Sequence, residues 1–478
     1  MLFNSLDFAI FLPIVFVLYW FVAKESAKYQ NILLVIASYI FYGWWDWRFL
    51  VLILFSTIVD YSLGIALSKE NRDKERKMLL LISVLINLGV LGVFKYYNFF
   101  IDNFTTAFSF FGKEIQNNSL NIILPVGISF YTFQTLSYTI DVYRRKLEPT
   151  NNFVAFSVFV SFFPQLVAGP IERATQLLPQ FYKKRNFNYN QAKEGLYLIV
   201  WGLFKKIVIA DTCANYANDI FSKYESMNSL SLFLGAIFFA FQIYGDFSGY
   251  SDIAIGTSRL FGVDLMRNFK YPYFSRDIAE FWRRWHISLS TWFRDYLYIP
   301  LGGSRGSKWF NVRNVFIIFL VSGFWHGANW TFIIWGGLNA LYFLPLLLRQ
   351  KNRRYLNDVA ENRIFPSFKE LAAMLSTFLL TTLSWVFFRA NSVTEALLYL
   401  KRLFSFSLEG GIQYLSIERY APELALLILL FLIIEWHSRT KEHPFFNKFR
   451  YVKLVGVIIG IITLGNYSSI NDFIYFQF

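Results

Sequence analysis

His326 is the residue whose sequence neighbours best suit it to chemistry. The chain has four histidines, and this one lies in an apolar segment, Phe316 to Trp335, within the run SGFWHGANW. An ionisable group is costly there and is a functional candidate by default. Its surroundings favour the neutral imidazole, which can accept a proton from a hydroxyl as that hydroxyl attacks a thioester. Gly323 and Gly327 predict room for a substrate beside the ring; the alternative is a hydrogen-bonded structural histidine.

His286 is the second candidate, and the apolar residues around it repeat at the spacing of a helix. From Asp277 to Tyr298 the large apolar side chains fall on one stripe, with charged residues opposite. The pattern predicts one continuous amphipathic helix at the membrane interface, capped by Asp277 and Glu280 and ended by Pro300. His286 lies at the edge of the stripe, a place that suits the mouth of a cavity, although a histidine there is often only amphipathic filler.

Arg283 and Arg284 add positive charge to the same predicted helix. Guanidinium groups match phosphate geometry, so both side chains could bind the phosphates of an acyl-coenzyme A on the cytoplasmic side. Anionic lipid headgroups explain the two arginines almost as well. The sequence leaves both interpretations open.

A polar island from Tyr244 to Asp252 interrupts another apolar segment with the run YGDFSGYSD. Its two glycines predict a broken helix, whose freed backbone amides could bind an oxyanion or a phosphate. Asp246 could orient a histidine there, and a purely structural helix break is the alternative. Ser248 in the island and Asn329 in the segment of the first histidine are candidate supporting or substrate-binding residues.

The composition places the chain in a membrane. It has 478 residues, of which 55% are hydrophobic and only 16% are charged, too apolar for a soluble protein of this length. The net charge of +14 comes from short Lys and Arg clusters between apolar runs, which fits positive-inside topology and lipid headgroups rather than nucleic acid. The single cysteine, Cys213, excludes an intramolecular disulfide and a multi-cysteine metal site. No metal and no bound cofactor are predicted.

The elements that must position these residues are apolar segments, about a dozen of them, several too short to span alone. We expect an all-α polytopic protein of about 10 to 12 transmembrane helices, with re-entrant and interfacial helices. Basic loops after the first, third and fifth segments predict a cytoplasmic side for those loops, a translocated loop from Asn98 to Asn121, and an N-terminus outside. The basic loop at 183–185 breaks this alternation and predicts a re-entrant segment near 153–190, beside a central cavity. Residues 1–478 are expected to form a single domain.

Eight short motifs occur in one order along the chain. They are MLFNS (1–5), YGW (42–44), FKYYNFF (94–100), PVGISFYTFQ (125–134), VAGPI (167–171), the polar island and the two histidine segments. With them the chain resembles the membrane-bound O-acyltransferase family, closest to its alginate O-acetyltransferase branch, with D-alanyl-teichoic acid and peptidoglycan acyltransferases as more distant relatives. Gly245 departs from the bulkier residue expected at that place.

The resemblance implies a ring of tilted helices around a central tunnel, with His326 buried midway and His286 nearby. It further implies that an acyl donor, acetyl-coenzyme A or an acyl carrier protein, delivers its acyl group from the cytoplasm. The group would cross the inner membrane to a polysaccharide acceptor, often with a periplasmic serine-type (SGNH) acetyltransferase as partner. A transporter or flippase for a lipid-linked glycan is the alternative from another class, because buried polar residues would serve it equally well. A scaffold that recruits periplasmic enzymes is a third.

Overall fold

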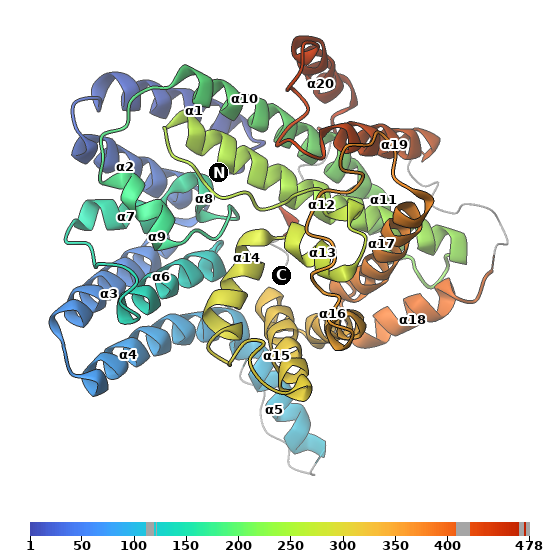
Figure 1. Ribbon diagram of the computed structural model, residues 1–478, viewed down its shortest axis with the longest axis horizontal. Coiled ribbons are helices and arrows are strands. Elements are labelled where there is room, and N and C mark those ends of the chain that lie inside the picture. The colour runs from blue at the N-terminus through green and yellow to red at the C-terminus, as the bar shows by residue number, and fades with distance from the viewer. Residues whose placement is uncertain (111–118, 121, 408–420, 468–472, 475–478) are drawn as a thin grey trace. The chain divides into compact units, whose positions relative to one another are not determined.

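The computed structural model describes residues 1–110, 119–120, 122–407, 421–467 and 473–474, and within these ranges the regular structure is helical (Figure 1). The chain divides into two compact units. Unit 1 comprises residues 1–196 and 254–266, and unit 2 comprises residues 197–253 and 267–478. The expected single domain over 1–478 stays a prediction.

Unit 1 holds the N-terminal helices and the loops that join them. Its helices are α1 (Leu6–Val17, continued by a π-helical turn Leu18–Val22), α2 (Ala27–Asp46), α3 (Leu50–Lys69), α4 (Asp73–Leu91), α5 (Tyr97–Phe110), α6 (Ile128–Tyr143), α7 (Phe153–Ser161), α8 (Phe163–Leu166), α9 (Ala174–Leu177) and the first turns of α10 (Tyr189–Leu203). Residues 254–266, which comprise the end of α12 (Ser229–Leu260) and the turn after it, complete the unit.

Unit 2 holds both histidine segments. Its helices are the end of α10 with a π-helical continuation (Phe204–Ala210), α11 (Asp211–Ser222), most of α12 (Ser229–Leu260), α13 (Ile278–Arg284), α14 (Ile287–Phe293), α15 (Lys308–His326), α16 (Trp330–Leu348), α17 (Phe368–Arg389), α18 (Val393–Leu403), α19 (Ala421–Ser438) and α20 (Arg450–Leu464). α15 and α16 pack along each other, and α16 packs on α17 (Figure 1).

Five helical segments of the described residues are long and apolar enough to cross a membrane. They are Ala27–Lys69, Asp73–Phe110, Ser229–Leu260, Trp330–Leu348 and Phe368–Arg389, with shorter apolar helices beside them. The first of these contains two 20-residue helices, α2 and α3, each about as long as the hydrocarbon core is thick. The prediction of an all-α polytopic membrane protein is therefore confirmed.

Two segments bear on the predicted topology. The structure builds 153–181 from α7, α8, α9 and a 3₁₀ turn (Leu178–Phe181), and α7 with 9 residues is only about 14 Å long, too short to span. This agrees with a segment that does not cross on its own. The loop expected from Asn98 to Asn121 is instead helical as far as Phe110, because 73–110 form one helical segment that ends with α5. Residues 111–118 and 121 lie outside the described residues.

Candidate active site

His326 is the last residue of α15, at the turn into α16. Its side chain is buried, with 4% exposed. Three aromatic rings enclose it, with centroid distances of 4.9 Å to Trp325, 5.2 Å to Trp335 and 5.3 Å to Phe388. The apolar segment predicted as one stretch is thus a pair of helices, and the histidine lies where they meet.

The glycines beside His326 do not make room for a substrate, so that expectation is wrong. A Cβ at Gly323 would overlap the carbonyl oxygen of Phe332, and a Cβ at Gly327 would overlap the Phe332 ring. Gly336 of α16 is equally close to the carbonyl oxygen of Phe319 in α15. The missing side chains let two helix backbones approach closely, which is a common use of glycine in membrane proteins.

Polar atoms nevertheless lie close to this aromatic enclosure. Trp335 Nε1, Trp282 Nε1 and Thr331 Oγ1 are buried and make no hydrogen bond within the described part of the chain. The Trp335 ring contacts both His326 and Trp282, at centroid distances of 5.2 and 5.6 Å. Buried donors are nearly always satisfied in native proteins. This region of unit 2 therefore suits a polar molecule that accepts hydrogen bonds.

His286 lies at a break between two helices rather than inside one. α13 ends at Arg284 and α14 begins at Ile287, and His286 between them has φ 43° and ψ 56°. The predicted continuous interfacial helix is therefore wrong, although Asp277 caps its start as expected, accepting from the N–H of Glu280 at 2.7 Å. A positive φ at a buried residue other than glycine costs about 1 to 3 kcal/mol and is common at functional sites.

The break at His286 is held by Asn268, a residue that sequence reasoning missed. The Asn268 carbonyl accepts the N–H of Ile287 at 2.9 Å, and its side-chain Oδ1 accepts the N–H of Ser288 at 3.2 Å and the Ser288 hydroxyl at 2.9 Å. These contacts replace the helical hydrogen bonds that would have continued α13. No pattern in the run RNFKYP (267–272) marks Asn268, apart from being an amide among aromatic residues.

Asn268 also sets the tautomer of His286. The Nδ1 atom of His286 lies 3.1 Å from Asn268 Oδ1, and the backbone N–H of Ser288 identifies that atom as an acceptor. Nδ1 must therefore donate, which places the lone pair of the neutral ring on Nε2. Burial lowers the pKa of His286 to about 3, so the ring is neutral at physiological pH.

Trp325 lies within ring contact of both histidines. Its centroid is 6.2 Å from that of His286 and 4.9 Å from that of His326. Phe247 of α12 packs edge-on against His286 at 4.6 Å. Unit 2 thus brings the two predicted catalytic residues to the same aromatic cluster, although 40 positions separate them in the sequence.

The polar island does not break its helix, contrary to the expectation. α12 runs without interruption from Ser229 to Leu260, so its amides are used inside the helix and form no anion site. The glycines serve close packing instead: a Cβ at Gly249 would lie 2.7 Å from the carbonyl oxygen of Gly202 in α10, and one at Gly245 would lie 3.0 Å from that of Lys205. The sequence cannot distinguish a glycine that bends a helix from one that admits a neighbour.

Asp246 is buried in ionic contacts with other parts of unit 2. Its Oδ1 lies 3.0 Å from Lys206 Nζ, and its Oδ2 accepts the N–H of Ile474 at 2.7 Å. Among the described residues it makes no hydrogen bond to a histidine, so its role in orienting one stays a prediction. Lys206 also pairs with Asp211 at 2.8 Å. Ser248 is fully buried, and its hydroxyl has no partner within the described residues.

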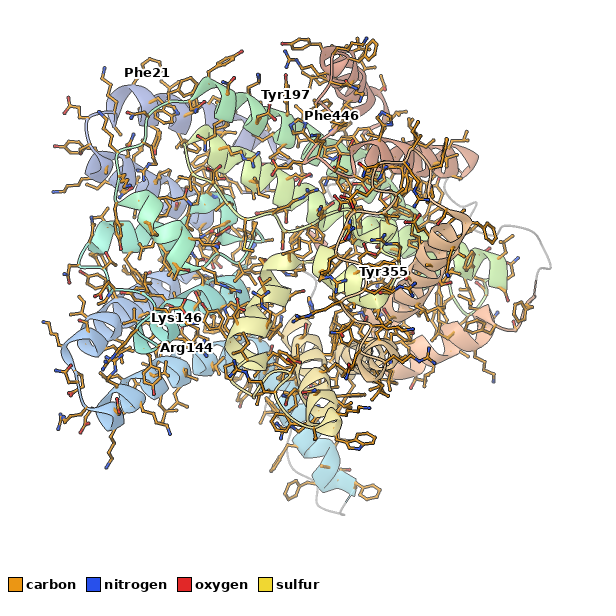
Figure 2. The ribbon with its side chains drawn as sticks, viewed as in Figure 1. Phe21, Arg144, Lys146, Tyr197, Tyr355 and Phe446 are labelled. Atoms are coloured by element: carbon orange, nitrogen blue, oxygen red, sulfur yellow. The ribbon has the colours of Figure 1, made fainter. Side chains whose placement is uncertain are left out.

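Arg283 and Arg284 differ in how they are held. Arg284 is buried and pairs with Glu280 at 2.9 Å and Asp358 at 3.2 Å. Arg283 is exposed and donates to two carbonyls of the loop between α16 and α17, including that of Tyr355 at 2.7 Å; Figure 2 shows Tyr355 beside α13. Both guanidinium groups thus fasten this loop to α13, and of the two only Arg283 is open to an incoming anion.

The remaining predicted residues have structural contacts. Asn329 caps α16, accepting the N–H of Thr331 at 3.0 Å and donating to the carbonyl of Asn391 at 2.9 Å. The basic run WHSRTKEHP (436–444) predicts a solvated loop around His437 and His443. His443 is instead buried, and its Nδ1 accepts the N–H of Phe445 at 3.1 Å. Cys213 is buried in α11, as a packing residue should be.

Fold and site together define a polytopic, all-helical membrane protein with two histidines buried in one aromatic cluster. Residues 40–384 match the membrane-bound O-acyltransferase (MBOAT) family. The match covers most of the chain, and the protein belongs to this family. It is an O-acyltransferase.

Named relatives are similar over most of their length. The probable alginate O-acetylase AlgI of Pseudomonas aeruginosa is 41% identical over 408 residues, covering 85% of this chain and 75% of that protein. The protein of the same name from Azotobacter vinelandii is 39% identical over 436 residues, covering 91% and 84%. A peptidoglycan O-acetyltransferase of Helicobacter pylori is 34% identical over 531 aligned positions, covering 100% and 98%.

Proposed function

We propose that this acyltransferase takes an acetyl group from a cytoplasmic donor and passes it across the inner membrane for O-acetylation of an exported polysaccharide. The observation that carries the proposal is the burial of His326 in an aromatic enclosure, with His286 in contact with the same indole, Trp325. The names of the relatives support acetyl as the group and alginate or peptidoglycan as the kind of acceptor. Membership of an acyltransferase family favours this function over the transporter and the scaffold.

In the proposed reaction His326 is the general base. Its neutral imidazole removes the proton of the acceptor hydroxyl while the oxygen attacks the thioester carbonyl carbon. The tetrahedral intermediate then collapses, the C–S bond breaks, and the imidazolium returns the proton to the thiolate. The products are an O-acetyl ester and a free thiol, so atoms and charge balance. The buried donors of Trp282, Trp335 and Thr331 are positioned around the enclosure to bind carbonyl or hydroxyl oxygens of the reactants.

His286 has a different role in this proposal. Because Nδ1 donates to Asn268, the ring presents Nε2 as a hydrogen-bond acceptor. His286 therefore orients an N–H of the acyl donor or the hydroxyl of the acyl acceptor, and it does not supply a proton. Arg283 is the candidate for contact with the phosphates of acetyl-coenzyme A, since Arg284 is already paired with two carboxylates. An acyl carrier would present its phosphopantetheine phosphate to the same side chain.

The cellular setting of the proposal follows the positive-inside pattern. The protein lies in the inner membrane with its N-terminus outside, and the acetyl group passes through a tunnel to the periplasm. A serine-type (SGNH) acetyltransferase there is the proposed partner that completes transfer to the glycan.

Complementation of a strain that lacks the gene tests this function. Ester-linked acetate on the exported polysaccharide, released by mild base, would be measured for the wild type, His326→Ala and His437→Ala, with the amount of each protein in the membrane compared. His437 is exposed at the end of α19 and serves as the matched histidine control. The proposal requires loss of acetate only in His326→Ala; full acetylation by that variant would remove His326 as the base.

A further inference from the structure

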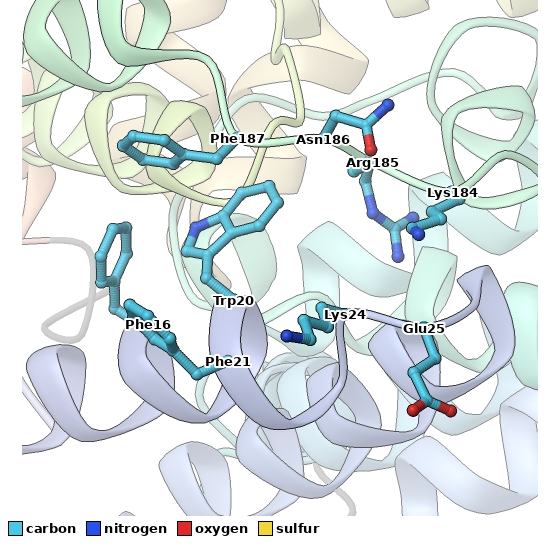
Figure 3. Close-up of a pocket in the computed structure, with 9 residues that line it drawn as sticks. All are labelled: Phe16, Trp20, Phe21, Lys24, Glu25, Lys184, Arg185, Asn186 and Phe187. Carbon is cyan, nitrogen blue, oxygen red and sulfur yellow. The ribbon is translucent and has the colours of Figure 1, made fainter.

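A cavity of about 520 Å³ lies in unit 1, in a part of the chain that the acyl transfer does not use. Its volume is in the range of ordinary small-molecule sites. The cavity forms where the end of α1 faces the loop before α10. It is lined by Phe16, Trp20, Phe21, Lys24, Glu25, Lys184, Arg185, Asn186 and Phe187 (Figure 3).

One wall of the cavity is aromatic and rigid. Trp20 donates its indole N–H to the carbonyl of Leu260 at 2.9 Å and packs edge-on against Phe187 at 5.5 Å. Phe16 meets the same Phe187 ring at 6.0 Å. Phe21, at the end of the apolar segment that contains α1, is 69% exposed and extends away from its helix (Figure 2). Such side chains suit the boundary between acyl chains and headgroups.

The opposite wall carries a buried cation, Arg185, whose side chain is held in place by neutral groups. Arg185 is 7% exposed. It donates from Nε to the Tyr19 hydroxyl, from Nη1 to the carbonyl of Gln180 at 3.2 Å, and from Nη2 to Asn31 Oδ1 at 2.7 Å. A guanidinium has five N–H donors, so two are left for an anion, and a buried charge calls for a counter-charge.

Two lysines surround the same space, so the cavity is strongly positive. Within the described residues, neither Lys24, Lys184 nor Arg185 forms an ion pair with a carboxylate. Glu25 also lines the cavity, but Figure 3 shows its carboxylate pointing away from Arg185. The two basic loops that conflicted in the predicted topology therefore meet at one cavity.

We propose that this cavity binds an anionic phospholipid, with its phosphate at Arg185, Lys24 and Lys184 and its acyl chains along the aromatic wall. The fixed guanidinium of Arg185 beside the aromatic wall matches a molecule that is anionic at one end and apolar at the other. Basic pockets between membrane helices on the cytoplasmic side bind such headgroups. The lipid would join α1 to the loop before α10.

Native mass spectrometry of the purified full-length protein tests the proposal. Phosphatidylglycerol and phosphatidylcholine with identical acyl chains would be titrated against the wild type, a Lys24→Gln/Lys184→Gln variant and a Lys28→Gln/Lys183→Gln variant. The second variant loses the same charge from neighbouring exposed lysines outside the cavity. All four lysines are exposed, so both variants should fold. Inorganic phosphate and free coenzyme A would be added as competitors.

The proposal requires that phosphatidylglycerol binds the wild type and the outside control alike and binds the Lys24→Gln/Lys184→Gln variant about 30-fold more weakly. Phosphatidylcholine should bind all three weakly. Equal phosphatidylglycerol affinity for the two variants would overturn the site. Displacement of the lipid by phosphate or coenzyme A at equal concentration would overturn its lipid identity, since the acyl chains would then contribute nothing.

Discussion

The contact between Asn268 and His286 leads to a prediction that separates positioning from mere stability. In Asn268→Leu, the N–H and the hydroxyl of Ser288 and the Nδ1–H of His286 lose their acceptor in a buried place. The hydroxyl can rotate towards another partner, which leaves two stranded N–H donors. Each stranded donor costs about 1 to 3 kcal/mol, so we expect about 2 to 6 kcal/mol of destabilisation. Such a loss is large beside a typical total of about 5 to 15 kcal/mol. We also expect kcat of the folded enzyme to fall, because the His286 ring loses the contact that fixes its orientation and tautomer.

The variant Asn268→Asp keeps the acceptor but adds a charge 3.1 Å from Nδ1. A nearby carboxylate raises a histidine pKa by about 1 to 3 units, which moves that of His286 from about 3 to about 4 to 6. The ring then stays neutral at pH 7.5 and becomes protonated towards pH 5, losing the lone pair on Nε2. Activity relative to wild type should therefore be nearly complete at pH 7.5 and should fall as the pH is lowered.

Steady-state acyl transfer in reconstituted membranes, measured from pH 5 to 8, provides the assay. Taking the ratio to the wild type cancels any pH dependence that the two proteins share. Asn314→Leu is the stability control: it removes a buried amide that donates to Gly303 at 3.0 Å, 12 residues or about 18 Å along α15 from His326. A flat ratio for Asn268→Asp, or an equal loss of kcat in Asn314→Leu, would refute the positioning role.

Two further predictions concern packing and donor binding. Gly336→Ala should destabilise the protein by about 1 to 3 kcal/mol or more, because its Cβ would overlap Phe319 of α15. Gly337→Ala is the control and should be nearly neutral in thermal unfolding, because its Cβ would meet only Leu320 at 3.7 Å. Equal melting temperatures of the two variants would contradict the close contact at Gly336. Arg284→Gln should destabilise the protein by about 1.5 to 3 kcal/mol, because Glu280 and Asp358 each lose one charged partner but keep Arg276 and Lys270. Arg283→Gln should instead raise the KM for the acyl donor, and an unchanged KM would exclude Arg283 from the donor site.

Sequence alone was enough to predict those features that depend only on residue type along the chain, namely membrane insertion and the burial of His326. Long apolar runs with few charges require a membrane, and an ionisable His326 in such a run must be enclosed, as the structure shows. These inferences depend on composition along the chain and not on which segments meet.

The sequence was insufficient where a distant segment decides the local structure. The apolar stripe around His286 continues through the break, because periodicity cannot register that Asn268 takes the N–H groups of Ile287 and Ser288. Gly249 looked like a helix break and is a close contact with Gly202. Lys205 and Lys206 inside an apolar stretch were the overlooked signal of buried ion pairs, with Asp252 at 2.6 Å and Asp246 at 3.0 Å.

The central claim is that His326 is the general base of an acetyl transfer whose acyl donor is cytoplasmic. It is tested most directly in inverted membrane vesicles. Radiolabelled acetyl-coenzyme A would be supplied to vesicles that contain the wild type or His326→Ala in equal amounts, and the label followed into glycan or into a partner protein. The account predicts transfer by the wild type and loss of transfer in His326→Ala. Equal transfer by both proteins would contradict it and would make His286 the next candidate for the base.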